Sequence, residues 1–519
     1  MTFQQANFQQ ASERVDVVIS GAGPNGLMLA CELALAGIRP VVLDALPGPS
    51  PEPKANGLVG QVVRMLDMRG LYQAFTGADG PPQPSYGWIF AAMPLSFFDV
   101  PDNPMHALLM PQPRLVRLLE KRARDLGVDV RWAHELSGVQ PGPESVALTV
   151  SSPERDYHMA AGYLVGADGG RSLVRKTLGI DFPGATSDVV SRLAHVHIPD
   201  ELRRPDGSVH IPGFGQLPFR HSRFDRGGLI FAELEPGRSL LGTIEFQPPV
   251  EEIPMSLAEL RESARRVLGV DFPFEEPKGP GPHALRRING QNTRQAEHYR
   301  DGRVLLLGDA AHVHSPMGGP GLNLGLQDTF NLGWKLAAQI NGWAPAGLLD
   351  TYESERYPVG RRVMMQSLSQ TALMAPGPEV SALRTLMGEL FTLPDVGKHM
   401  AGLLAGSDVG YDVGDDHPLS GRLMPVLTTE GGRRVDELLH DARPVLLDLG
   451  GGVADAARGW IDRVDIVNAT IANPPAAAML IRPDGYVAWA ADTFGPAEQP
   501  GLRAALQRWF GPESSGEQR

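Results

Sequence analysis

Cysteine is almost absent from this sequence. Its 519 residues include a single cysteine, Cys31, so no disulfide can form within the chain. One isolated thiol suits the reducing cytoplasm, and we therefore expect a cytoplasmic protein without a disulfide framework. The lack of a C-x-x-C pair also argues against thiol redox chemistry anywhere in the chain.

Long apolar runs and basic segments are missing as well. No run of about 18 apolar residues occurs, so no transmembrane helix is expected, and the polar N-terminus does not resemble a secretory signal. The formal net charge is −13 and no stretch is basic, which argues against nucleic-acid and anionic-membrane partners. A composition of 42% apolar and 21% charged residues is typical of a globular protein with roughly three domains of about 150 residues each.

The segment VDVVISGAGPNGLMLACELALAGIRPVVLDA, residues 15–45, has the pattern of a dinucleotide-binding unit. A β-branched run precedes a G-x-G-x-x-G turn at Gly21, Gly23 and Gly26, an Ala- and Leu-rich helix follows, and a second β-branched run ends at Asp44. The glycines allow a tight turn and the close approach of a pyrophosphate to the helix N-terminus. The acid is placed to accept hydrogen bonds from a ribose. The unit predicts an adenine dinucleotide but does not separate NAD from FAD.

A second glycine-rich stretch, GDAAHVHSPMGGPGLN at residues 308–323, has two possible interpretations. His312 and His314 beside Asp309 could bind a metal, or the glycines could let the backbone pack against a planar ligand. The two histidines stand two residues apart, so in a loop they need not converge on one ion, and no third histidine or cysteine supports them. The pattern therefore favours a ligand-binding loop without a metal, followed by a helix after Gly321.

Three motifs in this order, GAGPNG, GADGGRSLVR and GDAAHVHSPMGGPGLN, resemble those of the FAD-dependent aromatic hydroxylases related to para-hydroxybenzoate hydroxylase, the group A flavoprotein monooxygenases. The chain is most similar to the actinobacterial branch, which contains polyketide hydroxylases and rifampicin monooxygenases. Four further phrases are similar to that branch: LDMRGLY, RQAEHYRDGRV, LLDTYESERYPVG and IRPDGYVAW.

The resemblance implies an α/β fold. It has a Rossmann-like FAD-binding domain, an inserted β-sheet substrate domain and a C-terminal thioredoxin-like domain. The expected divisions are a flexible tail (1–13), the first part of the FAD-binding domain (14–185), the substrate-binding sheet (186–280), the second part of the FAD-binding domain with further helices (281–404), a linker (405–425) and the thioredoxin-like domain (426–519).

The family's FAD contacts carry over to matching positions of this sequence. The resemblance assigns the diphosphate to Gly21, Gly23, Asn25 and Gly26, the adenosine to Asp44 and Leu136, the flavin surroundings to Lys54 and Gln112, the shared FAD and nicotinamide region to Asp168, the ribityl or pyrophosphate region to Asp309, and the isoalloxazine ring to Pro316, Gly321, Leu322 and Asn323. Two departures stand out. Lys54 replaces a usual arginine and loses the planar fork, and Pro320 stands where the family commonly has Gln, so the loop is expected to be stiffer.

The resemblance implies an FAD-dependent monooxygenase that uses NADPH or NADH and dioxygen. A flavin C4a-hydroperoxide would hydroxylate a phenolic or polycyclic aromatic substrate of the polyketide type. Baeyer–Villiger oxygenation and antibiotic inactivation of the rifamycin or tetracycline type remain open on the same scaffold, and a non-catalytic flavoprotein is disfavoured by the complete motifs. The W-x-W-x-I-P motif of halogenases is absent. A phenolic substrate reacts best as phenolate, but no catalytic base can be assigned: His195, His197 and His221 are candidates, and an ordinary exposed or packing role is favoured for each. The expected assembly is a monomer or homodimer.

Overall fold

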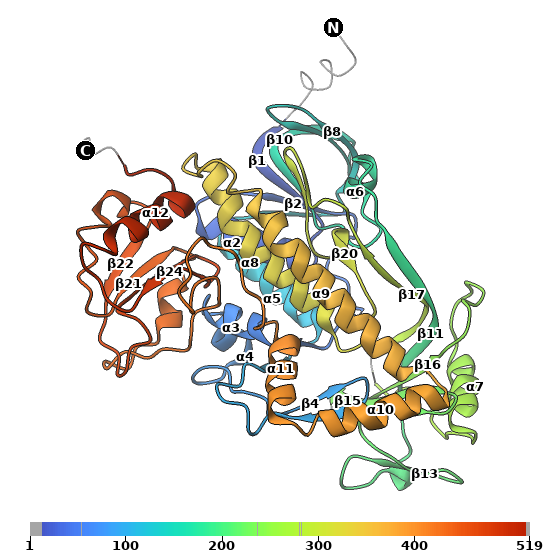
Figure 1. Ribbon diagram of the computed structural model, residues 1–519. Helices are drawn as coiled ribbons and strands as arrows, with labels where there is room; N and C mark the ends of the chain where they lie inside the picture. The colour runs from blue at the N-terminus through green and yellow to red at the C-terminus, as the bar shows by residue number, and fades with distance from the viewer. Residues whose placement is uncertain (1–12, 53, 236, 280, 282, 515–519) are drawn as a thin grey trace.

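The computed structural model describes residues 13–52, 54–235, 237–279, 281 and 283–514. The tail predicted at residues 1–13 thus lies outside the described residues apart from Glu13, which begins the first strand. A parallel sheet with its helices occupies the centre of Figure 1, an antiparallel sheet extends to the right, and the C-terminal residues form a unit on the left.

The parallel sheet is built from short, β-branched strands that are buried on both faces. Such strands read as nearly continuous apolar runs, as VVIS does at the end of the first strand. The strand order is β18-β19-β10-β1-β2-β7, and a meander continues from β10 to β9 and β8. The bounds are β1 Glu13–Ser20, β2 Val41–Asp44, β7 Asp129–Trp132, β8 Glu135–Pro141, β9 Val146–Ser151, β10 Tyr157–Gly166, β18 Arg300–Asp301 and β19 Val304–Leu306.

Helices cover this sheet. Helix α2 contacts both α5 and α8, and Gly333 of α8 lets the two backbones approach, because a Cβ there would lie 2.7 Å from Cβ of Glu32 on α2. The helices of this part are α2 Pro24–Leu35, α3 Gln61–Asp67, α4 Leu71–Thr76, α5 Gln112–Asp125, α6 Leu173–Thr177, α8 Pro320–Ile340, α9 Thr351–Met374, α10 Pro378–Leu390 and α11 Pro394–Ala405. Small paired strands lie below them: β3 Gly57–Val59 with β6 Ala107–Leu109, and β4 Gly87–Phe90 with β5 Met93–Ser96.

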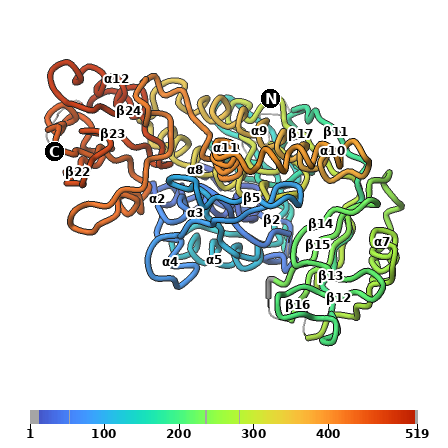
Figure 2. Tube along the Cα trace, turned by 60° about the horizontal axis from the view of Figure 1, so that its bottom comes forward, coloured from blue at the N-terminus to red at the C-terminus, as the bar shows by residue number. Residues whose placement is uncertain are grey.

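The inserted part is an antiparallel sheet in the order β14-β15-β16-β11-β17-β20. Helix α7 Leu257–Leu268 packs on one face, where alternate residues such as Ala194, Phe231 and Leu241 form a core with Leu260. In Figure 2, strands β12 to β16 and helix α7 of this part lie together on the right. The strands are β11 Gly184–Val196, β14 His221–Phe224, β15 Gly227–Glu235, β16 Arg238–Glu245, β17 Leu285–Gln295 and β20 His312–Val313, with a small ladder of β12 Val209–Ile211 and β13 Gly215–Leu217 beside them.

The C-terminal unit has a thioredoxin-like sheet in the order β22-β21-β23-β24. Strands β21 Val445–Asp448 and β22 Asp465–Asn468 are parallel, and β23 Ala478–Ile481 and β24 Val487–Ala491 continue the sheet as an antiparallel hairpin. Helix α12 Gln499–Phe510 packs against β24. Cys31 lies far from this unit in sequence, buried in α2, where burial raises the pKa of its thiol to about 12. The C-terminal unit contains no cysteine.

Among the residues that the structure describes, no helix combines the length and the apolar character that a membrane span requires.

Candidate active site

Three acidic residues follow strands of the parallel sheet at one of its edges. The strand register aligns Ser20 with Leu43 and with Gly166, and Gly166 with Leu306. Asp44, Asp168 and Asp309 lie one to three residues beyond this row. Ligands of open α/β sheets bind outside the carboxyl ends of the strands, so this edge is the candidate cofactor site.

The glycine turn after β1 is shaped for the close approach of a ligand. A Cβ at Gly26 would lie 2.0 Å from the carbonyl oxygen of Gly21, so the helix can pack on the turn only without a side chain there. A Cβ at Gly23 would meet no protein atom within 4 Å. Gly23 is also the N-cap of α2 and offers no side chain to the first backbone N–H groups of the helix. These free donors and the open space above them fit a diphosphate.

Polar atoms around the turn have capacity left for a ligand. Asp44 accepts the backbone N–H groups of Ala22 (2.8 Å) and Leu46 (2.9 Å), which fixes its carboxylate while leaving lone pairs for ribose hydroxyls. Oδ2 of Asp168 accepts the N–H of Val174, at 3.1 Å, but its buried Oδ1 has no protein partner in the described part of the chain. The same holds for Oδ1 of Asn25. Buried polar atoms normally have partners, so these orphan oxygens fit a site for a polar cofactor such as FAD.

The segment from Asp309 to Asn323, here called the 309–323 loop, leads from β19 into α8. Asp309 is exposed, three residues after the end of the buried strand β19. Gly319 is the N-cap of α8 with a φ of 69°, and a Cβ there would meet nothing within 4 Å. Asn323 accepts the N–H of Val59 on β3 (2.8 Å) and donates to the Gly319 carbonyl (2.8 Å). The loop thus presents an open helix N-terminus, which stabilises negative charge, next to β3.

The remaining predicted contacts lie around this loop and along the sheet. Gln112 begins α5 and donates its backbone N–H to Ala55, at 2.9 Å, close to β3 in sequence. Lys54 is exposed, and its carbonyl accepts Arg286 of β17, at 3.4 Å. Leu136 is buried on β8, which contacts β2. Pro316 is exposed and Leu322 half-buried within the loop. Every predicted cofactor residue therefore belongs to the carboxyl edge or to the elements beside it, and each role stays a prediction.

The two histidines of the loop point to different partners. Nε2 of His312 lies 2.7 Å from Oδ2 of Asp328, and both side chains are buried. His314 Nδ1 lies 2.9 Å from the Ser315 carbonyl, and burial lowers the pKa of His314. Within the described ranges, no group of three or more His, Cys, Asp or Glu side chains could hold a metal.

We therefore expect a metal chelator to leave the activity of the purified protein unchanged. The motivation is that His312 and His314 pair with an acid and a carbonyl instead of converging. Activity assays before and after EDTA dialysis, with elemental analysis, check this. Stoichiometric zinc or iron whose removal abolishes activity would contradict it.

The antiparallel sheet is joined directly to the 309–323 loop. Strand β20 is part of the loop and pairs with β17, with Gln295 opposite His312. Oγ of Ser315 donates to Gln291 on β17 (2.6 Å), which in turn donates to Ser191 on β11 (3.2 Å). The face of the sheet turned away from α7 therefore abuts the loop.

A methionine-rich cluster fills the space between this sheet face, the loop and hairpin β4–β5. Its buried members include Val189 and Ile244 of the sheet region, Phe90 and Phe97, and the methionines Met93, Met105, Met317, Met374 and Met400. Methionine is flexible and polarisable and packs well against aromatic rings. The hairpin turn has positive φ at Ala91 (50°) and Ala92 (62°), and the Ala91 backbone is held by Gln370 (3.2 Å) and Arg384 (2.6 Å). Non-glycine residues in this region carry strain, which is frequent at ligand sites.

The phenylalanines between residues 214 and 246 lie mostly away from this cluster. Phe231 lies in the core beneath α7, with Phe214 and Phe224 packed against that core, and Phe219 stacks edge-on against Phe231. Only Phe246 of this set packs on the methionine-rich cluster. Alternation along a strand sends half of its side chains to each face, and here most phenylalanines point toward α7.

The three candidate bases have ordinary surroundings. Nδ1 of His195 accepts the Ala284 N–H at 3.0 Å. His197 pairs through its backbone with Glu275. Burial lowers the pKa of His221, which lies on β14, opposite Ile230 of β15. None of these contacts involves the 309–323 loop.

Sequence reasoning missed a set of buried charges beneath the loop. Asp328, Lys335, Glu355, Arg356 and Arg482 are all buried. The signal was present in α8, where Asp328 and Lys335 interrupt the apolar sequence LGLQDTFNLGWKLAAQI seven residues apart. A charge in an all-round apolar helix requires a buried partner, but the sequence does not show which partner.

Known proteins match this arrangement over nearly the whole chain. Residues 14–367 match the FAD binding domain family, and residues 417–513 match the aromatic-ring hydroxylase C-terminal family. A 12-dehydrotetracycline 5-monooxygenase/anhydrotetracycline 6-monooxygenase of Streptomyces rimosus is 41% identical over 96% of this chain and 99% of its own length. A rifampicin monooxygenase of Streptomyces venezuelae is 37% identical over 96% of this chain and 100% of its own.

Solved structures agree with the sequence matches. The anhydrotetracycline hydroxylase OxyS of Streptomyces rimosus superposes with a TM-score of 0.83, with 41% identity over 96% of this chain and 100% of that chain. The similarity thus extends over both the FAD-binding part and the C-terminal unit, and it covers 99–100% of these relatives' own lengths. The chain belongs to the FAD-dependent aromatic hydroxylase family related to para-hydroxybenzoate hydroxylase, and it is an FAD-dependent monooxygenase.

Proposed function

We propose that this enzyme hydroxylates a phenolic, polycyclic aromatic compound of the polyketide type, with NADPH or NADH as reductant and dioxygen as the oxygen source. The observation that carries the proposal is the junction of the antiparallel sheet and the 309–323 loop, with the methionine-rich cluster between them. The identity of 41% to a tetracycline monooxygenase supports a multi-ring substrate.

The chain's own residues bind FAD, place the substrate and exclude water. FAD, when bound, would accept electrons from the nicotinamide cofactor and transfer one oxygen atom of dioxygen to the substrate. Gly21, Gly23, Asn25 and Gly26 would hold its diphosphate, with Asp44 at the ribose. The first turn of α8 would hold the flavin ring. Asp168 keeps an unpartnered buried oxygen for this region.

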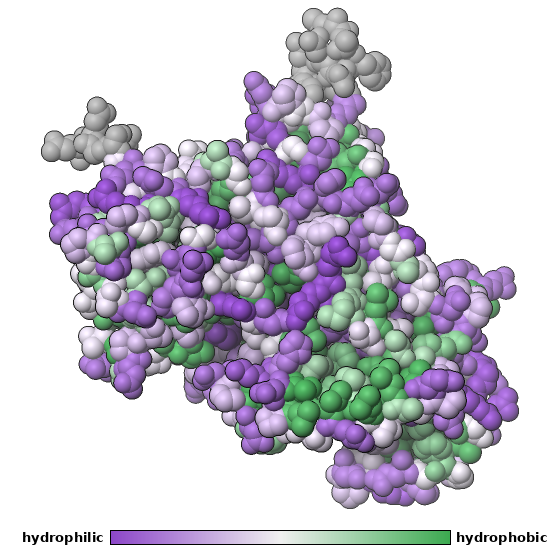
Figure 3. All heavy atoms as spheres, viewed as in Figure 1, coloured by the Kyte–Doolittle hydropathy of each residue, from purple (hydrophilic) through white to green (hydrophobic). Residues whose placement is uncertain are grey.

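The substrate would lie against the methionine-rich cluster. The buried side chains of the cluster would keep water away from the reacting carbon of the substrate. This exclusion matters because water diverts the activated oxygen to hydrogen peroxide. Outside this cluster, Figure 3 shows a hydrophobic patch where Figure 1 places α10. That helix exposes Leu383, Leu386 and Leu390, and Met387 packs against the cluster. An apolar surface next to the cluster suits the approach of an apolar substrate.

A second candidate function is oxygenation that inactivates an antibiotic or inserts oxygen beside a ketone. The identity of 37% to a rifampicin monooxygenase favours it. Both functions need the same flavin site, so they differ in the product and not in the cofactor.

We expect one atom of heavy dioxygen to enter the product. Purified enzyme is mixed with NADPH, labelled dioxygen and a panel of phenolic polycycles and rifamycins, and the products are analysed by mass spectrometry. NADPH oxidation should rise with a good substrate, and a poor one should give hydrogen peroxide with little product. A labelled phenolic hydroxyl supports hydroxylation, and a labelled ring ester moves the assignment to Baeyer–Villiger oxygenation. Product whose new oxygen comes from water would refute both.

A further inference from the structure

Arg356 of α9 is a fully buried guanidinium that makes three contacts, two with α8 and one with Tyr411. Its Nε donates to Oδ1 of Asp328 (2.7 Å), and one terminal nitrogen donates to the Leu324 carbonyl in the first turns of α8 (3.4 Å). The other terminal nitrogen donates to the hydroxyl of Tyr411 (3.0 Å). Arginine suits such a role because its planar fork offers several fixed donors.

Two of these contacts hold the two sides of the 309–323 loop. Asp328 uses its second oxygen for His312, near the start of the loop, at 2.7 Å. Leu324 directly follows the end of the loop. Burial acts to raise the pKa of Asp328, but the charges of Arg356 and His312 outweigh it and lower the pKa, so the carboxylate is ionised. The loop is therefore clamped at both ends by one charged group.

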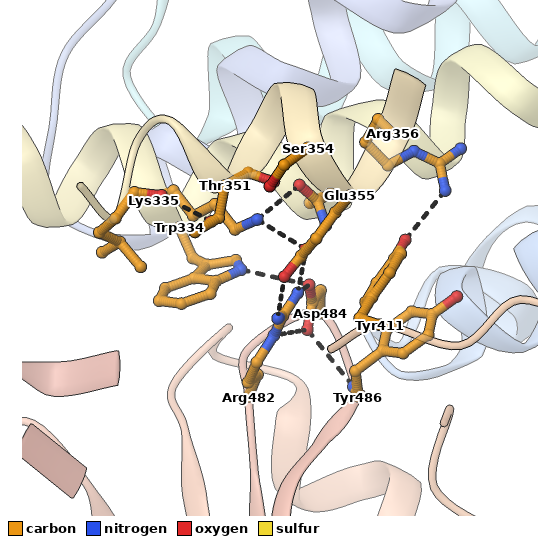
Figure 4. Close-up of polar contacts among 12 residues, drawn as sticks. Trp334, Lys335, Thr351, Ser354, Glu355, Arg356, Tyr411, Arg482, Asp484 and Tyr486 are labelled. Carbon is orange, nitrogen blue, oxygen red and sulfur yellow. Dashed lines mark hydrogen bonds and ion pairs between the residues drawn. The ribbon is translucent and has the colours of Figure 1, made fainter. Parts of the chain in front are cut away.

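The third contact of Arg356 leads to the C-terminal unit. The Tyr411 backbone N–H donates to Gly421, and the Gly421 N–H donates to Val487 of β24, each at 2.9 Å or less. The Tyr411 ring lies against Tyr486, with centroids 4.3 Å apart, as Figure 4 shows. Tyr411 is thus fixed to the C-terminal sheet although it precedes it in sequence.

A neighbouring cluster joins the same parts without touching the loop. Glu355 accepts both terminal nitrogens of Arg482 (2.6 and 2.9 Å) and Nζ of Lys335 (2.7 Å) (Figure 4). Arg482 also pairs with Asp484 beside it. This cluster accounts for the attachment of the C-terminal unit, so attachment alone does not require the Tyr411 hydroxyl.

We propose that the C-terminal unit positions the 309–323 loop through Tyr411 and Arg356, and so contributes to FAD affinity and to the yield of hydroxylated product. This inference rests on the proposed flavin-binding role of the loop. Arg356 and Tyr411 are positioning residues: they act on the loop through Asp328, His312 and Leu324.

The test compares two substitutions that each delete one phenol oxygen from the same ring pair. Tyr411→Phe removes the acceptor of Arg356 and keeps the stacked ring. Tyr486→Phe removes a hydroxyl that donates to Gln61, at 3.4 Å, and that also bonds to Tyr411, but it keeps the Tyr411 hydroxyl that accepts from Arg356. Lys335→Met serves as a second control, because it perturbs the neighbouring cluster without touching the loop.

We expect Tyr411→Phe to weaken FAD binding roughly tenfold, the scale of one hydrogen bond to a charged group. Apoprotein titrated with FAD gives the dissociation constant, and thermal unfolding of the apoprotein gives its stability. Hydrogen peroxide released per NADPH should also rise in this variant. Tyr486→Phe should keep the wild-type FAD affinity, and Lys335→Met should lower apoprotein stability without changing that affinity.

The inference is overturned if Tyr411→Phe binds FAD as the wild type does, whatever its stability. It is equally overturned if all three variants weaken FAD binding to the same degree, because that would indicate general loosening. The titration needs no substrate. If the wild-type enzyme hydroxylates no aromatic compound, the proposed substrate class is wrong. The FAD affinities of the variants would still test the inference.

Discussion

Replacement of Gly23 by alanine should leave the fold intact and remove most FAD binding. Gly23 has an ordinary φ of −71°, and a Cβ there meets no protein atom within 4 Å, so the apoprotein has no reason to lose stability. The methyl group would stand at the N-terminus of α2, where the diphosphate is expected. Overpacking of about 1–3 kcal/mol corresponds to a roughly 5- to 150-fold larger FAD dissociation constant.

The matched control is Gly26→Ala, three residues further along the same turn. Its Cβ would lie 2.0 Å from the Gly21 carbonyl oxygen, so α2 must shift and both the unfolding temperature and FAD binding should fall. FAD titration and thermal unfolding of both apoproteins separate the two effects. If Gly23→Ala binds FAD normally, the diphosphate does not pass over this residue and the site is misplaced.

Replacement of Glu355 by leucine should be among the most destabilising single changes in the protein. The Glu355 carboxylate is buried and accepts from Arg482, Lys335 and Asn331, the last at 2.6 Å. Burial raises its pKa, but the charges of Arg482 and Lys335 outweigh this and hold the pKa well below its usual range. Removal of one member of a buried ion pair leaves an uncompensated charge and costs about 3–5 kcal/mol.

Thermal unfolding of the apoprotein, followed by circular dichroism, measures this loss. Lys335, whose pKa burial already lowers to about 8, would lose its partner and become neutral more easily. The control is Glu262→Leu, which breaks the exposed pair with Arg265 on α7 and should leave the unfolding temperature unchanged. Equal unfolding temperatures for Glu355→Leu and wild type would show that the cluster is not needed for stability.

The sequence predicted those parts of the structure that depend on neighbours along the chain. The unit from β1 to Asp44 has its turn glycines, its helix and its terminal acid within about 30 residues. The segments LAHVHIP, GLIFAEL and LLGTIEF, which overlap β11, β15 and β16, carry a strand signal of the same local kind. The fold class followed from these units and from the family resemblance.

The buried charges could not be predicted because their partners are far apart in sequence. Arg482 and Glu355 are separated by 127 residues, and Arg69 and Glu32 by 37. The phrases that resemble the family branch supply these residues: LDMRGLY gives Arg69, LLDTYESERYPVG gives Glu355 and Arg356, and IRPDGYVAW gives Arg482. Arg69 also donates to the carbonyls of Leu439 and Pro483, each within 2.8 Å. The charged residues of these three segments thus make contacts that join the central part to the C-terminal unit.

Strand β20 has a mechanical consequence. Because it is both the edge strand of the antiparallel sheet and part of the 309–323 loop, the sheet cannot tilt without pulling on the backbone of that loop. Two residue pairs of the β17–β20 ladder, Arg294 with Val313 and Gln295 with His312, carry this coupling.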